Sequence, residues 1–186
     1  MADTMVDADL VLRFKAGEDS AFDGLVHRYM KEAFAFCLRL TRNAQEAEEL
    51  SQDGFVNAYR ALREFRGEST FKSWLYRILI NQYRDRTRSR RREERRLEVV
   101  KDSETRRQER EGAQGVGELH ASELEDVVKD KVEGLPDRQR EVLVLHLYQG
   151  LDYHEIAAAL GCTYDDVKMN LSLARKRLKE SLKEYL

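Results

Sequence analysis

The sequence predicts an all-α protein of two small helical domains, joined by a flexible charged linker, with a helix-turn-helix in the second domain. Its 186 residues contain one proline and ten glycines, too few for the frequent turns of a β-sandwich or barrel. Apolar residues recur at helical spacing toward both ends, and a highly charged stretch separates them. These observations divide the chain into a first domain (1–92), a linker (93–120) and a second domain (121–186).

The composition argues against a membrane protein and against a disulfide-stabilised one. No run of about 18 apolar residues is present, and the acidic start of the chain is unlike a secretory signal. Cys37 and Cys162 are far apart and in no metal-binding or redox spacing. We therefore expect a cytoplasmic protein without metal or cofactor, in which Cys37 fills the core of the first domain.

A net charge of −2 conceals a strong segregation of charge along the chain. Residues 84–96 hold 8 basic and 3 acidic side chains, whereas residues 97–134 hold 6 basic and 11 acidic ones. The arginine cluster favours a polyanion partner, because each cation placed on a phosphate releases counterions. A solvated helix end is the alternative. The acidic stretch contains Gly112, Gly115 and Gly117 and is typical of a mobile linker.

The apolar spacing of the first domain predicts consecutive amphipathic helices. Asn43 and Glu46 predict a capping box, in which two side chains satisfy free amides of the first helical turn. A turn at 66–68 leads to a last helix that runs directly into the arginine cluster. Trp74 falls within the apolar stripe of this helix, so a core position is favoured over stacking on a base.

The second domain begins again near Ser122 with four helical stretches. Pro136, the only proline, is expected in the first turn of a helix, where its missing amide costs nothing. Asp152 with Glu155, and Thr163 with Asp166, predict caps on either side of a tight turn. A short helix, a turn and a longer helix form a helix-turn-helix, whose second helix enters a DNA major groove. A plain helical hairpin has the same apolar spacing and stays open as an alternative.

Two segments of the first domain, AEELSQDGFVNAY (47–59) and FRGESTFKSWLYRILINQYRDRTR (65–88), resemble the second conserved domain of bacterial extracytoplasmic-function sigma factors. Residues 135–178 resemble their fourth domain, and the order of the domains matches as well. The resemblance implies a transcription initiation factor, not an enzyme, that binds core RNA polymerase and opens promoter DNA at the minus-ten element. It also implies an anti-sigma partner, which can hold the protein at the inner membrane face, and no small-molecule substrate.

The resemblance also assigns roles to individual residues. The polymerase contacts are Glu49, Gln52 and Asp53. The minus-ten contacts are Gly67, Ser69, Phe71, Lys72, Arg77, Asn81, Arg84 and Arg88, with Asn81 at the position that reads the element. The minus-thirty-five contacts are Thr163, Lys168, Asn170, Ser172 and Arg175. These residue types suit the role, because asparagine pairs with adenine and arginine with guanine or phosphate.

The sequence departs from the family at Asp165 and Asp166, where two carboxylates begin the groove-entering helix and would repel phosphates. This departure keeps open a sigma-like mimic that titrates an anti-sigma factor without binding promoters. An ordinary helix-turn-helix regulator would leave the first ninety residues without a role. An enzyme is disfavoured, since His154 and Glu155 lack the second histidine of a zinc motif, where Ala158 stands instead.

Overall fold

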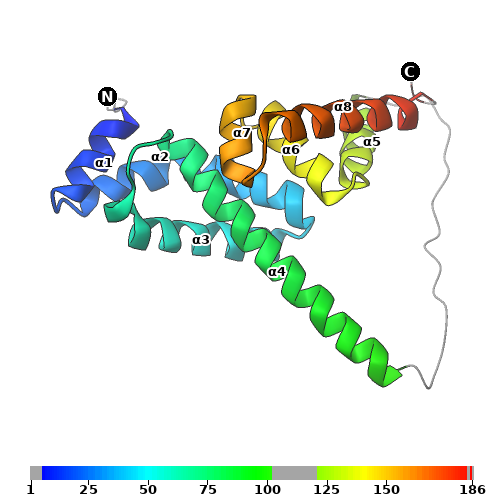
Figure 1. The fold of residues 1–186 in the computed structure, drawn as a ribbon, viewed down its shortest axis with the longest axis horizontal. Helices are drawn as coiled ribbons and strands as arrows, with labels where there is room; N and C mark the ends of the chain where they lie inside the picture. Colours follow the sequence, from blue (N-terminus) through cyan, green and yellow to red (C-terminus); the bar gives the residue numbers. More distant parts are fainter. Residues whose placement is uncertain (1–5, 102–120, 184, 186) are drawn as a thin grey trace.

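The computed structural model describes residues 6–101, 121–183 and 185, and over these ranges the chain is helical without a strand. Two groups of helices lie against each other, and one long helix extends away from both (Figure 1). The predicted all-α class with two helical parts is therefore confirmed.

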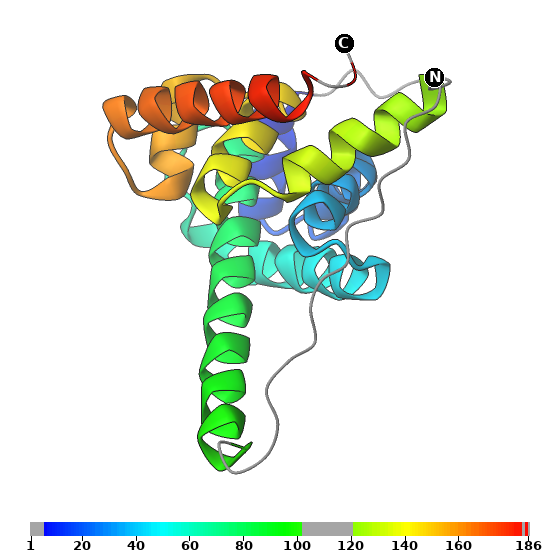
Figure 2. The ribbon, with the colours of Figure 1, turned by 90° about the vertical axis from the view of Figure 1, so that its right-hand side faces the viewer.

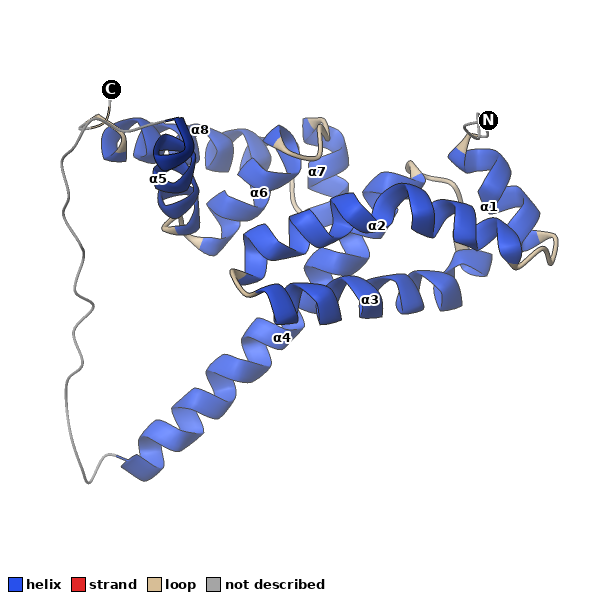
Figure 3. Ribbon diagram, turned by 180° about the vertical axis from the view of Figure 1, so that it is seen from behind, coloured by secondary structure: helices blue, strands red, loops and turns tan. Residues whose placement is uncertain are grey.

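The N-terminal group consists of α1 (Asp7–Lys15), α2 (Ser20–Thr41), α3 (Ala44–Ala61), the short 3-10 helix η1 (Leu62–Glu64) and α4 (Phe71–Lys101). α2 and α3 lie side by side, and α4 packs against both (Figure 3). Aromatic side chains join the helices: the rings of Phe36 and Tyr76 lie 4.8 Å apart edge to face, and those of Phe14 and Tyr59 lie 5.1 Å apart. Such pairs add specific geometry to a core held mainly by apolar burial.

Cys37 lies in this core, as its place in the apolar stripe of α2 predicts. Its side chain is fully buried, and desolvation raises the pKa of the thiol to about 12. Burial penalises the thiolate, which is the reactive form of cysteine. Cys37 is therefore an inert apolar filler at neutral pH.

The helix that carries the arginine cluster is longer than expected. α4 continues through residue 101, so residues 93–101 of the expected linker are helical; the rest of that expected linker, residues 102–120, lies outside the described ranges. Arginine and glutamate are good helix formers. Pairs such as Glu93 and Arg96, 3.9 Å apart, support the last turns from one face.

The C-terminal group consists of α5 (Ala121–Glu133), α6 (Asp137–Leu147), α7 (Tyr153–Leu160) and α8 (Tyr164–Ser181). Both predicted caps here are full capping boxes, Asp152 with Glu155 on α7 and Thr163 with Asp166 on α8. Gly161, with φ +61°, makes the left-handed turn between them. The helix-turn-helix is thus present, with α8 as its second helix.

Two details of the helix starts differ from expectation. Pro136 is the N-cap of α6 and lies one residue before the first turn. Asn43 accepts a hydrogen bond from the Glu46 amide at 3.0 Å, but the reciprocal half of the capping box is missing. The Glu46 carboxylate instead lies 3.0 Å from Arg90 of α4, so a tertiary ion pair has replaced a local bond.

The two groups share a polar interface built on α4. The C-terminal helices gather over the first part of α4, while its last turns extend away from them (Figure 2). The buried Tyr76 hydroxyl donates to the Gln149 side chain of the loop before α7, and the Ser73 hydroxyl donates to Glu155 over 2.7 Å. The Arg39 guanidinium also lies 4.0 Å above the ring of Tyr148. The groups are therefore joined by specific polar contacts.

Gly54 of α3 lies against Leu79 of α4, and Gly54→Ala is expected to destabilise the protein. An added Cβ would lie 2.2 Å from Leu79 Cδ2, and Leu79 is fully buried. Overpacking of this kind costs about 1–3 kcal/mol, more than the roughly 1 kcal/mol that alanine gains over glycine in a helix. Thermal unfolding should show a lower midpoint for Gly54→Ala than for Gly134→Ala, whose Cβ meets nothing closer than 3.5 Å. Equal midpoints would contradict the clash.

Candidate nucleic-acid interface

The outer face of α3 brings the three predicted polymerase contacts together. Glu49, Gln52 and Asp53 are all exposed, because the opposite side of the helix, which carries Leu50 and Phe55, faces the core. Glu49 lies 3.9 Å from Arg86 of α4, and Asp53 forms an ion pair with the same guanidinium. α3 therefore presents an acidic surface that also neutralises one arginine of α4.

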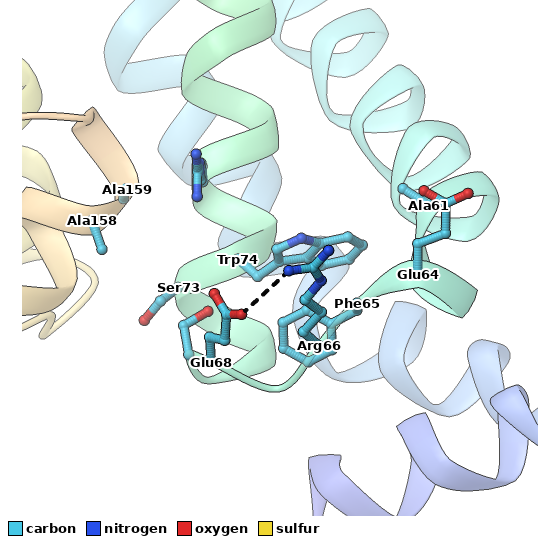
Figure 4. Close-up of a pocket in the computed structure, with 11 residues that line it drawn as sticks. Ala61, Glu64, Phe65, Arg66, Glu68, Ser73, Trp74, Ala158 and Ala159 are labelled. Atoms are coloured by element: carbon cyan, nitrogen blue, oxygen red, sulfur yellow. Dashed lines mark ion pairs between the residues drawn. The ribbon is translucent and has the colours of Figure 1, made fainter.

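The loop between η1 and α4 borders a cavity of about 380 Å³ (Figure 4). Gly67 takes φ +74°, a conformation that glycine adopts without strain and that lets the chain turn back toward α4. The rings of Phe65 and Trp74 lie 5.0 Å apart in the lining, and Ser69 and Arg77 line the cavity as well. Aromatic faces beside a cation are what a protein uses to hold an unstacked base and its backbone.

The C-terminal group closes one side of the same cavity. Ala158 and Ala159 of α7 belong to its lining, and Figure 4 shows them across from the loop. Glu155 holds α7 in place by accepting from the hydroxyls of Ser73 at 2.7 Å and Thr70 at 3.3 Å. The same carboxylate completes the capping box of α7. One glutamate thus serves a local cap and a contact between the two groups.

Two predicted minus-ten residues, Phe71 and Lys72, contact other helices of the N-terminal group. Phe71 is only 3% exposed, with its ring 5.5 Å from that of Tyr29 and 5.9 Å from that of Trp74. A base cannot reach this ring in the described conformation, so Phe71 supports the loop from the core. Lys72 is half-buried and lies 3.3 Å from Glu32 of α2.

Of the remaining predicted side chains of α4, three are exposed to solvent and one contacts the C-terminal group. Arg77, Asn81 and Arg88 are exposed. Arg84 instead donates two hydrogen bonds to Glu141 of α6, at 3.0 and 2.5 Å, and one to the Leu160 carbonyl at 3.2 Å. The bonds to Glu141 raise the pKa of Arg84. A phosphate can replace Glu141 only if the two groups move apart.

Charged residues of α6 were not singled out by the sequence, yet they bind α4. Arg140 donates to the Tyr83 hydroxyl at 3.0 Å, and Asp137 pairs with Arg91 at 2.6 Å. Partial burial tends to raise the pKa of Asp137, but the hydrogen bond from Arg91 and the charges of Arg140 and Arg91 outweigh it and lower the pKa. Helical spacing marks only the apolar side of α6, so no local pattern reveals these partners.

The predicted minus-thirty-five residues lie along α8 with different exposures. Lys168, Ser172 and Arg175 are exposed. Thr163 is held in the cap, where its hydroxyl donates to Asp166 at 2.8 Å. Asn170 donates to the Asp166 carbonyl at 2.8 Å, so its amide is turned onto its own helix. Met169 and Leu173, which are not among the predicted base contacts, are 55% and 40% exposed.

Asp166 stabilises the start of α8 in a pH-dependent way. The hydrogen bond from the Thr163 backbone amide, and then that from its hydroxyl, lower the pKa of Asp166 below 3.8. The cap therefore contributes its full stability above that value and loses it as the pH falls through the lower, folded-state pKa. Asp166→Ala should lower the midpoint of thermal unfolding at neutral pH. At acidic pH, the midpoints of the variant and the natural chain should become equal. Asp165→Ala, beside the cap, is the control; a difference independent of pH would contradict this role.

Within the described residues, the structure holds no group of three or more histidine, cysteine, aspartate or glutamate side chains that could bind a metal ion. None of the described helices combines the length and apolar character needed to cross a bilayer.

Two family descriptions match the chain in the order in which its two helical groups occur. Residues 25–93 match Sigma-70 region 2, which covers α2, α3 and the arginine-bearing part of α4. Residues 126–178 match Sigma-70, region 4, which covers the helix-turn-helix. The acidic face of α3 and the loop beside the cavity therefore fall within the first matched segment, and the candidate contacts on α8 fall within the second.

Relatives match over nearly the whole chain. The RNA polymerase sigma-H factor of Pseudomonas aeruginosa is 32% identical over 190 residues, covering 97% of this chain and 95% of that protein. The ECF RNA polymerase sigma-E factor of Haemophilus influenzae is 30% identical over 191 residues, and the match covers 100% of this chain and 100% of that protein.

Two solved structures share the fold. The sigma factor RpoE in complex with the anti-sigma factor NepR, from Bartonella quintana, superimposes with a TM-score of 0.69 at 28% identity, covering 87% of this chain and 96% of that one. CnrH in complex with the cytosolic domain of CnrY gives a TM-score of 0.69 at 27% identity, covering 95% and 97%. The chain therefore belongs to the extracytoplasmic-function sigma factors, the transcription initiation factors that direct RNA polymerase to chosen promoters.

Proposed function

We propose that this sigma factor divides its work among three surfaces. The acidic face of α3 binds core RNA polymerase through Glu49, Gln52 and Asp53. The loop at 65–70 and the exposed face of α4 capture and open the minus-ten element. α8 reads the minus-thirty-five element. The chain supplies no catalytic group of its own, and it acts in the cytoplasm with the polymerase.

The cavity beside the loop is the observation that carries the minus-ten assignment. Unstacking a base costs a few kcal/mol, so DNA opening needs a site that receives the base and cations that hold its backbone. Phe65 and Trp74 line the cavity with aromatic surface, and Arg77 lines it with a cation. Asn81 is exposed one turn further along α4, where its amide can pair with a base edge.

The contacts between the two groups support a second element of the proposal, which is that they separate during initiation. The Glu141 carboxylate accepts two hydrogen bonds from the Arg84 guanidinium, and α7 covers one side of the cavity. Promoter phosphates can take the place of Glu141 once α6 and α7 leave α4. The chain would then divide at the segment between α4 and α5, slightly later than the expected boundary at residue 92.

We infer that an anti-sigma factor binds this chain and controls its access to polymerase. Two structural relatives, RpoE and CnrH, were solved with the partners NepR and the cytosolic domain of CnrY. A partner that binds both helical groups would hold them as the structure has them, with Arg84 and the cavity covered. Purification of the chain from its own cells, with identification of the bound protein, tests this inference.

Reconstitution with purified core polymerase tests the proposal as a whole. Core enzyme with this chain is expected to start transcription from a restricted set of promoters, which selection from a random DNA pool identifies. Core enzyme alone is the control. The absence of a stable complex with core enzyme would overturn the proposal and favour a mimic that only titrates an anti-sigma factor.

A further inference from the structure

The outward face of α8 has an unusual composition for a helix that enters DNA. Val167, Leu171 and Ala174 are buried and fix which side of the helix faces the core. At 3.6 residues per turn, the line opposite to them carries Asp165, Met169, Ser172 and Lys176, with Leu173 beside it, and all five are exposed. Met169 therefore stands at the centre of the face that points away from the protein.

Two apolar side chains thus occupy the surface that a helix-turn-helix presents to base edges. Met169 and Leu173 are one turn apart, at i and i+4, so they form one continuous apolar strip. Exposed Met and Leu are not held there by packing within the chain, since the described core uses the other side of α8. The strip also begins in the first half of the helix, which is the half that contacts bases.

Exposed cations lie to one side of this strip on α8, and cations beside a base-reading surface are what phosphate contacts require. Lys168 and Arg175 are exposed along one edge of α8, and Lys176 and Lys179 lie nearby. Asn170, which could have read adenine, has its amide bonded to the Asp166 carbonyl. Met169 and Leu173 are the exposed apolar side chains of this outward face. In the major groove, the apolar group that distinguishes one base is the 5-methyl of thymine.

We propose that Met169 and Leu173 determine the base preference of this sigma factor by packing against thymine methyl groups in the upstream promoter element. The proposal rests on the proposed reading of that element by α8. It predicts thymines at the bases opposite the two side chains. Asp165, next on the same line, can only accept hydrogen bonds when ionised, so a cytosine amino group is the base edge that suits it.

Replacing thymine by deoxyuridine tests the proposal, because it removes only the methyl group. Core polymerase with the full chain would first select fragments with a randomised upstream element, and the selected fragments would be resynthesised with deoxyuridine at one position at a time. With the natural chain, we expect about four-fold weaker binding at each contacted thymine, as the loss of one buried methyl implies. Met169→Ala and Leu173→Ala should each bind the thymine fragments more weakly. Each should also bind thymine and deoxyuridine equally well at the one position that its missing side chain contacts.

Leu12→Ala is the matched control, since Leu12 is also an exposed leucine, 65% accessible, but lies on α1. It should keep the full preference for thymine over deoxyuridine. Binding that is indifferent to every thymine methyl, or variants that keep the natural preference, would overturn the proposal while leaving promoter binding intact. Weaker assembly of Met169→Ala with core enzyme in the absence of DNA would also overturn it, because the strip would then contact protein. Failure of the natural holoenzyme to bind any fragment would instead overturn the proposed function.

Discussion

In a Glu141→Ala variant, the two helical groups are expected to separate in the free protein. Glu141 is buried, with 4% of its side chain exposed, and it pairs with Arg84 and Arg138. Arg84 and Arg138 keep 26% and 32% of their side chains exposed, so water compensates part of the loss, and a hydrogen bond to a charged group contributes about 1.5–3 kcal/mol. Since each 1.4 kcal/mol is a tenfold change in an equilibrium constant, the closed arrangement should lose about ten- to a hundredfold in population relative to the open one.

Small-angle scattering measures this change as a larger radius of gyration. Glu180→Ala, on the exposed surface of α8, is the control for the loss of a glutamate. Arg84→Ala should open the protein in the same way, and the double variant should differ little from either single one if the two residues act as a pair. The open variants should also bind a single-stranded minus-ten oligonucleotide more tightly when Arg84 is present. An unchanged radius in Glu141→Ala would contradict a role of the pair in holding the two groups together.

Asn81→Ala is expected to leave core polymerase binding unchanged and to reduce promoter opening by between about five- and a hundredfold. Asn81 is exposed on α4, on the helix that carries Trp74 and Arg77 of the cavity lining. A good bidentate contact from a side chain to a base is worth about 1–3 kcal/mol. The acidic face of α3, which is the proposed polymerase contact, is untouched by the change.

Permanganate reactivity of unpaired thymines measures opening, and titration of core enzyme measures assembly. Asn57→Ala removes an equally exposed asparagine from α3 and should open promoters as the natural chain does. Normal opening by Asn81→Ala would remove this residue from the minus-ten site. Phe71→Ala is not an equivalent test, because Phe71 is in the core and truncating a buried phenylalanine costs about 3–5 kcal/mol of stability.

The helices and their ends were predictable because local physics determines them. Apolar spacing placed α2, α3 and α8, and the pairs Asp152 with Glu155 and Thr163 with Asp166 marked helix starts that the structure confirms. A cap needs only residues within one turn, so its signal survives in the sequence. Cys37 belongs to the same class, since its place in an apolar stripe was enough to predict its burial.

The tertiary structure decided which of the candidate side chains are accessible. Phe71 and Asn81 both belong to the segment that resembles the family, yet one is buried and the other exposed. Arg84 has the same charge as Arg88, but only Arg84 meets Glu141, 57 residues away along the chain. The positions of these partners depend on how α6 and α7 pack on α4, which no local pattern encodes.

By itself, the sequence determined that this protein is helical and where most helices begin, because both follow from the spacing of neighbouring residues. It also contains the segments that resemble the family. Only the tertiary structure decided that the two helical groups contact each other through α4, and that Phe71 is buried while Asn81 is exposed. The physical reason is the separation along the chain of the groups that interact. A helix is stabilised by groups within a few residues of each other, whereas an interface brings together charges and surfaces that are far apart in the chain.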